Sequence, residues 1–301
     1  MKRGPLIALA ATGAALVIAA GVMVFALTRP ESADAVAERY LQALATGDVD
    51  AVAALLAEPD ETVLAAFAAA DAYLADPVVT DAVAGEVGTG FRAEAALDGA
   101  DTTVLFTLTD ESGTWTVTDS LATIDVATTL GDAVSIGDAV LPLGEEGVVS
   151  VLPAVYTLQA APTDFLDGAA TVAATNAQPL SAAIDASLSP DAAARAQPQL
   201  DAYADACVAP AETLPDRCGL QVPWPADLTA LDTLTTRIDT YPVLQIDDAA
   251  LTFTASGGSV VVTAAGTDRE GTADSVTYRT DDWTLRGTVS FAGDELVLTV
   301  F

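Results

Sequence analysis

The spacing of apolar and polar residues divides the chain into segments with different expected structures. Residues 6–27 form one apolar run without a charged side chain. Residues 32–76 place apolar side chains three and four positions apart, as on one face of an α-helix. After residue 78 most segments alternate apolar and polar side chains, which is typical of half-buried β-strands. The pattern predicts an apolar segment, then a group of helices, then a chain rich in strands.

Three helices are expected within residues 32–76. Either Ser32 or Asp34 can cap the first helix, and Gly47 suits the left-handed residue that often ends one. Asp48 can then cap a short second helix. The third helix is expected over residues 61–74, because its alanine-rich sequence has a high helix propensity.

A β-hairpin is expected after these helices. A strand around Phe106 and a strand around Trp115 each alternate apolar with polar side chains, and residues 110–113 between them are typical of a turn. Phe91 and residues 83–87 suggest earlier strands. These strands predict an antiparallel sheet with one apolar face.

The remainder of the chain is mostly β in pattern. Residues 129–186 are β-rich, residues 189–207 have a helical pattern that Ser189 can cap, and residues 242–301 are β-rich again. Residues 283–291 alternate strictly, which is the strongest strand signal in the chain.

The domain organisation leaves one alternative open. Residues 278–285 echo residues 106–117 in the order of their aromatic, threonine and aspartate residues. Either a second copy of one module has diverged, or two amphipathic strands are alike by chance. In both cases the fold class is α+β, with a helix-plus-curved-antiparallel-sheet module over residues 32–128 and a second β-rich α+β domain over residues 129–301.

Two short motifs carry a resemblance over residues 32–128. They are Ala37-x-x-Tyr40-Leu41-x-Ala43-Leu44-x-x-Gly47-Asp48-x-x-Ala51 and Gly113-x-Trp115-x-Val117. With three helices before a sheet, this part of the chain resembles the nuclear transport factor 2-like superfamily, also called cystatin-like. The resemblance implies helices that close one side of a curved sheet around a cone-shaped cavity. It also implies a partner-binding or spacer role, as in the membrane-anchored exported proteins of actinobacteria that carry such modules.

The implied cavity gives one set of candidate binding residues. A small apolar ligand in it would contact Tyr40, Leu44, Phe67, Phe91, Phe106 and Trp115. Enzymes of the superfamily commonly use His, Asp or Tyr in the cavity, and this chain has no His. Packing in a core is the simpler interpretation of these side chains.

The apolar segment sets the expected location. At about 1.5 Å per residue, the 22 residues 6–27 span roughly 33 Å, enough to cross a hydrocarbon core of about 30 Å. Lys2 and Arg3 precede the segment and every acidic residue follows it, so residues 1–5 are expected in the cytoplasm and the bulk outside the cell membrane. An uncleaved, single-pass signal anchor is favoured. A cleaved signal peptide is the alternative, with its best cleavage motif at residues 33–35.

Composition removes several classes of function. The chain has 11 Lys and Arg against 43 Asp and Glu, so it lacks the basic surface that nucleic acids require. Without His, and with Lys2 as the only lysine, it lacks His-based triads, the P-loop lysine and Schiff-base chemistry. We therefore expect no enzyme, no catalytic residues, no cofactor and no metal site.

Cysteines and aspartates are the remaining candidates for chemistry. Cys207 and Cys218 are expected to form a structural disulfide, since a redox pair is normally Cys-x-x-Cys. Three acidic pairs are candidate calcium ligands, but none follows the calcium-loop pattern: Asp48-x-Asp50, Asp247-Asp248 and Asp281-Asp282.

The sequence favours a non-catalytic extracytoplasmic protein. It would bind the lipid bilayer through residues 6–27 and another component of the cell envelope elsewhere. Small apolar-ligand binding in the cone is the alternative, and a carboxylate-based hydrolase is less favoured. A filled cone favours partner binding, whereas an open apolar cavity favours the ligand.

Overall fold

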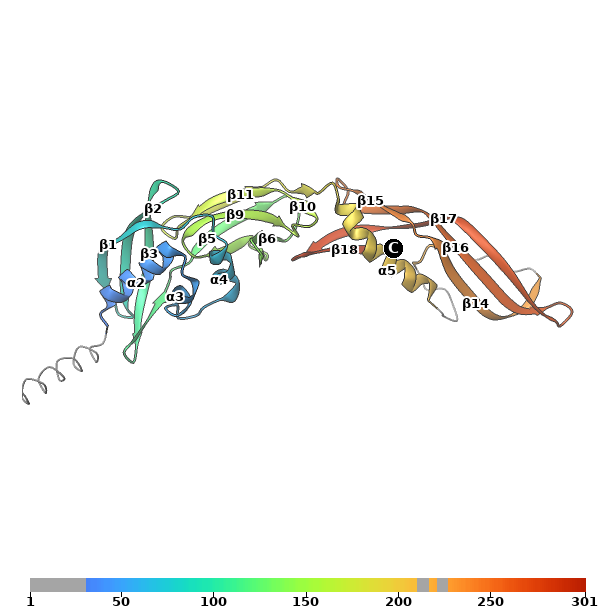
Figure 1. The fold of residues 1–301 in the computed structure, drawn as a ribbon, viewed down its shortest axis with the longest axis horizontal. Helices are drawn as coiled ribbons and strands as arrows, with labels where there is room; N and C mark the ends of the chain where they lie inside the picture. The colour runs from blue at the N-terminus through green and yellow to red at the C-terminus, as the bar shows by residue number, and fades with distance from the viewer. Residues whose placement is uncertain (1–30, 210–216, 221–226) are drawn as a thin grey trace, which may run out of the picture. The chain divides into compact units, whose positions relative to one another are not determined.

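A computed structural model describes residues 31–209, 217–220 and 227–301 of the chain. These residues form a mixed α+β fold made mostly of strands (Figure 1). The expected tail at residues 1–5 and the expected transmembrane segment at residues 6–27 lie outside the described residues. Within the described ranges, no helix combines the length and apolar character that crossing a membrane requires.

The fold consists of two compact units, and each unit is made of two separate stretches of the sequence. The first unit contains the chain up to Pro59 and again from Leu74 to Ser120. The second contains residues 60–73 and residues 121–301. A short stretch that includes the third helix therefore belongs to the second unit.

The first unit consists of two helices and one antiparallel sheet. Its elements are α2 (Ala33–Thr46), α3 (Val49–Ala53), β1 (Ala75–Ala84), β2 (Thr89–Leu97), β3 (Ala100–Glu111) and β4 (Thr114–Thr118). The strand order is β1-β2-β3-β4, and α2 lies across the curled sheet (Figure 1). β1 contains two irregularities in its pairing with β2, and such bulges increase the local twist of a strand.

Local signals fixed the ends of the first helices as expected. The Ser32 hydroxyl accepts the Ala35 N–H at 3.3 Å, and Gly47 ends α2 in the left-handed conformation with φ 66°. Asp48 caps α3 by accepting the Ala51 N–H at 3.0 Å. These three expectations, together with the β3–β4 hairpin, are confirmed.

The first part of the second unit contains one helix and nine short strands. They are α4 (Glu61–Ala68), β5 (Ala122–Thr128), β6 (Ala133–Ile136), β7 (Ala139–Pro142), β8 (Val148–Val151), β9 (Ala154–Ala161), β10 (Leu166–Asp167), β11 (Ala169–Ala174), β12 (Leu180–Ile184) and β13 (Ser187–Leu188). Their sheet orders are β11-β9-β6-β7, β12-β5-β8 and β10-β13, and β12 runs parallel to β5.

The third helix is shorter than the sequence predicts. It ends at Ala68, although helix was expected through residue 74. The reason is a tertiary pairing: Asp71 donates its backbone N–H to Val155 at 2.8 Å, and Ala72 forms an antiparallel bridge with Val155. Helix propensity is a weak preference that tertiary contacts can override, so the pairing with β9 ends the helix despite its alanine-rich sequence.

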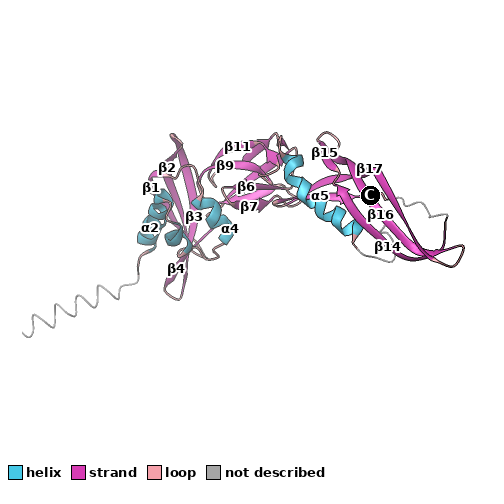
Figure 2. Cartoon of the chain, turned by 45° about the vertical axis from the view of Figure 1, so that its right-hand side comes forward, coloured by secondary structure: helices cyan, strands magenta, loops and turns pink. Residues whose placement is uncertain are grey.

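The second part of the second unit places one helix on a sheet of long strands. Its elements are α5 (Ala192–Val208), β14 (Leu228–Thr240), β15 (Val243–Asp247), β16 (Thr252–Asp268), β17 (Ala273–Ala292) and β18 (Glu295–Val300). The order is β14-β16-β17-β18, with β15 also paired to β16, and α5 runs along this sheet (Figure 2). Their shared core includes Leu200, Phe253 and Trp283.

The start of α5 corrects one expectation. Asp191, not Ser189, occupies the N-cap position, and no side chain caps the helix. Ser189 instead donates its backbone N–H to the Phe165 carbonyl at 2.8 Å. That pairing holds Ser189 before the helix start, where its hydroxyl is buried without a hydrogen-bond partner in the described residues.

Two glutamines of α5 bond to the edges of the sheet beneath it. The Gln197 amide donates to the Pro242 carbonyl at 3.0 Å and accepts the Leu244 N–H at 2.9 Å, as a neighbouring strand would. Gln199 makes the equivalent two bonds to the backbone of β18, at 3.3 and 3.0 Å. Residues two apart on a helix point to nearly opposite sides, so α5 reaches β15 and β18 at once.

Candidate functional site

The structure divides the six candidate ligand-binding residues between the two units. Tyr40 and Leu44 lie in α2, Phe91 in β2, Phe106 in β3 and Trp115 in β4 of the first unit. The sixth, Phe67, lies in α4 of the second unit, where its ring centroid is 5.1 Å from that of Tyr73.

Four of the candidates form a continuous core in the first unit. Tyr40, Leu44, Phe91 and Phe106 are each at most 3% exposed. The Tyr40 ring meets the Phe106 ring edge-on at 5.1 Å between centroids, and Phe91 stacks on Phe106 at 5.3 Å. Such separations are those of directly packed aromatic side chains. These side chains fill the space between α2 and the sheet with one another.

Trp115 lies at the border of this unit rather than in its core. Its side chain is half-buried, and its indole N–H donates to the Glu31 backbone carbonyl at 2.9 Å. Glu31 precedes the cap of α2 and pairs with Arg39 at 2.7 Å. Trp115 therefore holds the entry of the chain into α2 against β4.

The Tyr40 hydroxyl is the most unusual polar group of the first unit. It is buried and has no hydrogen-bond partner of good geometry among the described residues. Burial raises the pKa of Tyr40 well above its ordinary value, and the nearby Ser120 hydroxyl opposes this rise only in part. Burial therefore favours the neutral form of this phenol.

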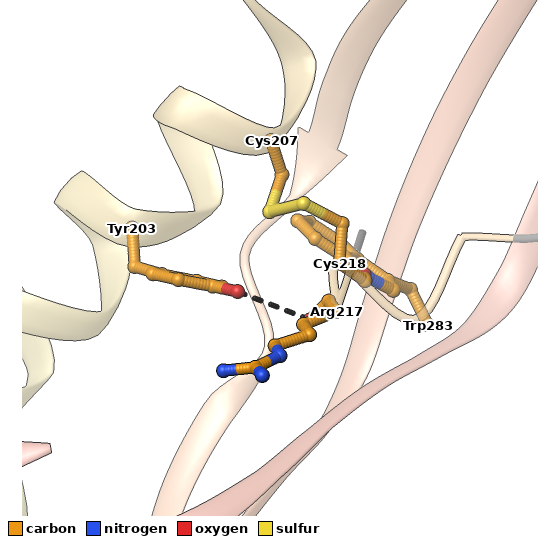
Figure 3. The surroundings of a disulfide bond; sticks show 5 residues. All are labelled: Tyr203, Cys207, Arg217, Cys218 and Trp283. Atoms are coloured by element: carbon orange, nitrogen blue, oxygen red, sulfur yellow. Dashed lines mark hydrogen bonds between the residues drawn. A yellow bond between two sulfur atoms is a disulfide. The ribbon is translucent and has the colours of Figure 1, made fainter. Parts of the chain in front are cut away.

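The two cysteines form the expected disulfide at the end of α5. Cys207 and Cys218 are both buried and bonded, with Cα atoms 5.6 Å apart (Figure 3). The Trp283 indole donates to the Cys218 carbonyl at 2.7 Å, and the Tyr203 hydroxyl donates to the Arg217 carbonyl at 3.1 Å. The bridge joins α5 to β17 through a packed tryptophan, which is a structural role.

One aspartate of each acidic pair makes a hydrogen bond or ion pair with residues close to it in the sequence. Asp247 accepts the N–H groups of Ala249 and Ala250, both at 3.1 Å, and so stabilises a turn. Asp281 pairs with Arg279 at 2.7 Å, and Asp48 caps a helix. Over the ranges that the structure describes, no three residues of the metal-binding types come together.

The sequence did not indicate a groove on the surface of the first unit. It has a volume of about 360 Å³ and lies between α2 and β1, lined by Glu38, Leu41, Gln42, Pro77, Val78 and Val79. Leu41 is buried at its base, whereas Val78 is 60% exposed.

A strand was expected over residues 83–87, but β1 ends at Ala84 and a turn follows. β1 escaped recognition because most of its side chains are exposed, so it shows no alternation of burial.

A second hollow of about 410 Å³ lies in the second unit. It is lined on one side by Leu121, Thr123 and Asp125 and on the other by residues 176–180. In the part of the chain that the structure describes, the first unit thus has packed aromatic side chains in its core and a groove at its surface, and the second unit has a hollow. None of the protein-family models, curated proteins or solved structures compared with the chain matches it.

Proposed function

We propose that this chain is a membrane-anchored, extracytoplasmic protein without catalytic activity that binds another component of the cell envelope. The packed interior of the first unit carries the proposal. The Phe106 ring contacts the rings of both Tyr40 and Phe91 where a small ligand would have to lie. Recognition then takes place on the outer surface, where macromolecular partners bind.

The expected location has separate support. The Cys207–Cys218 disulfide is typical of proteins outside the reducing cytoplasm. The apolar run at residues 6–27 and the charges on either side of it favour an anchor with the bulk outside. A strongly acidic chain is repelled by anionic lipid surfaces, so a partner in the envelope is more consistent than a second contact with the bilayer.

In-cell crosslinking tests the proposal. A photoreactive amino acid is placed in the full-length chain at Val87 or Val243, which are 83% and 61% exposed, and at buried Phe106 as the control. We expect an ultraviolet-dependent adduct with one defined envelope protein from at least one exposed position and none from Phe106. Adducts with cytoplasmic proteins, or no adduct from either exposed position, would contradict the proposed function.

A further inference from the structure

We infer that β1 and the groove beside it bind an extended, basic segment of the partner protein, which adds to the sheet as a further strand. The inference rests on the proposed function and assigns it a surface and a partner chemistry. An edge strand with a groove beside it supplies both needs of strand addition: backbone groups for affinity and a recess for alternate side chains.

The two edges of the sheet in the first unit differ in whether another part of the chain bonds to their backbone. At β4, Ala57 donates its backbone N–H to Val117 at 3.0 Å, and Val117 donates to Leu55 at 2.7 Å. That edge is therefore covered by the chain itself. At the other edge β1 pairs with β2, and no other described strand pairs with it. An open edge presents unpaired N–H and C=O groups to any extended chain that fits.

The open edge carries an unusual number of exposed apolar side chains. Val78 and Val83 in β1 are both 60% exposed, and Val87 in the following turn is 83% exposed. They make up three of the eight large apolar residues exposed in the described parts of the chain. Open edges are usually protected by charges, proline or bulges, and β1 has Asp76, Pro77, Asp81 and two bulges before Asp81. Val78 and Val83 nevertheless stay exposed on this edge, and exposed valines there favour contact with another chain.

The groove gives the added strand a place for its side chains. Leu41 of α2 forms the apolar base, and Pro77, Val78 and Val79 form the wall on the side of β1. Glu38 lies on the helix side. Alternate side chains of a strand point to opposite faces, so a residue of the partner segment that lies beside residues 77–79 could place its side chain in this groove.

Charge selects a basic segment over a second copy of this chain. Asp76 and Asp81 lie in β1, Glu86 in its turn and Glu38 in the groove, against Arg92 opposite Asp81 in β2. Two β1 strands paired with each other would bring these acids together between chains of net charge −32. Like charges across an interface oppose association, whereas lysine or arginine on the partner would be attracted.

Selection from a random peptide-display library tests the inference. Full-length chain in detergent is the bait, and we expect selected peptides that alternate apolar residues with Lys or Arg. The variant Val78→Lys should lower their affinity about tenfold, because it places a positive charge beside the basic side chains of the peptide. The matched control Val243→Lys, at 61% exposure against 60% for Val78, should leave affinity unchanged. Equal losses in both variants, or selected peptides that are acidic, would overturn the inference.

The mode of binding is tested with one selected peptide. Hydrogen exchange should slow at the amides of β1, and N-methylation of alternate peptide nitrogens should abolish the protection, because strand addition needs those donors. Unchanged binding after N-methylation in either register would contradict strand addition. A concentration-dependent dimer with self-protected β1 would show a second copy as the occupant and also overturn the inference. An envelope adduct at Val243 combined with no peptide effect at β1 would leave the proposed function standing and remove only this inference.

Discussion

The helices α2 and α5 each lie beside a sheet, but they treat the nearest strand edges differently. Gln197 and Gln199 of α5 bond to the backbones of β15 and β18. In α2, Glu38 and Gln42 border a groove, and within the described residues no side chain of α2 bonds to the backbone of β1. In α5, glutamine side chains that both donate and accept hydrogen bonds protect the neighbouring strand edges, whereas α2 makes no such bonds to β1 in the described residues.

This difference separates a closed sheet from one that can accept another strand. The amide of glutamine carries a carbonyl oxygen and an NH₂ group, so it can replace the two bonds of a missing strand residue. Carboxylates such as Glu38 accept but do not donate, and they cannot satisfy an edge in this way. Water can satisfy the backbone groups of the open β1 edge, so the edge needs no protein partner to be stable.

The largest loss of stability is expected from a substitution in the core of the first unit. Phe106→Ala removes a buried ring that contacts Tyr40 and Phe91, and we expect a loss of about 3–5 kcal/mol of unfolding free energy. Denaturant unfolding of the full chain measures it. The control Val87→Ala, at an exposed position, should change stability by less than about 0.5 kcal/mol. A tolerated Phe106→Ala would indicate a ligand cavity instead of a core.

Removal of the disulfide should cause the next largest loss of stability, because the bridge fixes the end of α5, the helix that bonds to β15 and β18. The double variant Cys207→Ala/Cys218→Ala avoids a free thiol and should lose about 3 kcal/mol, the chain-entropy value for a loop of this size. Denaturant unfolding and hydrogen exchange in α5 measure the loss. An unchanged midpoint would show that the Trp283 contact alone holds the end of α5.

The edge bonds themselves should have a smaller effect. Gln197→Met keeps the shape of the side chain but leaves the Pro242 carbonyl and the Leu244 N–H without their partner, at a cost of about 1–3 kcal/mol. The matched variant Gln42→Met in α2 should lie within about 0.5 kcal/mol of the parent. Faster exchange at the Leu244 amide in Gln197→Met alone would confirm the comparison. Equal effects of the two variants would show that α2 protects its edge too.

Sequence predicted those features that depend on neighbours along the chain. Ser32, Gly47 and Asp48 set helix ends within one turn of themselves, so their residue types were sufficient. The strand over Trp283 to Phe291 alternates strictly because one face is buried, and the cysteine pair could bond only with itself. These expectations are confirmed.

Features that depend on distant parts of the chain were not visible in the sequence. The end of α4 at Ala68 depends on Val155, and the start of α5 depends on the bond between Ser189 and Phe165. The role of Gln197 and Gln199 appears only once α5 lies on the sheet, since glutamine is common on any helix surface. The same applies to the groove, which combines residues of α2 with a strand whose exposure hides its pattern.

The smallest effect at neutral pH is expected at Tyr40. Its hydroxyl is buried without a partner of good geometry, so Tyr40→Phe loses no hydrogen bond and should change stability by less than about 1 kcal/mol at pH 7. A clear loss at neutral pH would show that the hydroxyl has a bonded partner, with Ser120 the nearest candidate.

At alkaline pH, Tyr40 should make a measurable contribution to the pH dependence of stability. Burial raises the pKa of Tyr40 in the folded chain, whereas a tyrosine in the unfolded chain titrates near about 10. The contribution of the buried phenol to the free energy of unfolding is complete below about pH 10. Above that pH it falls by about 1.4 kcal/mol per pH unit, because only the unfolded state releases the proton. Urea unfolding between about pH 9 and 11 should show a shallower decline in Tyr40→Phe than in the parent. Tyr241→Phe is the control: the Asp205 carboxylate raises the pKa of Tyr241 too, but this exposed ring is screened by solvent, so the parent slope should remain. Parallel slopes for Tyr40→Phe and the parent would mean that the phenol of Tyr40 reaches water in the folded state, and the core at the centre of the first unit would then be open rather than packed.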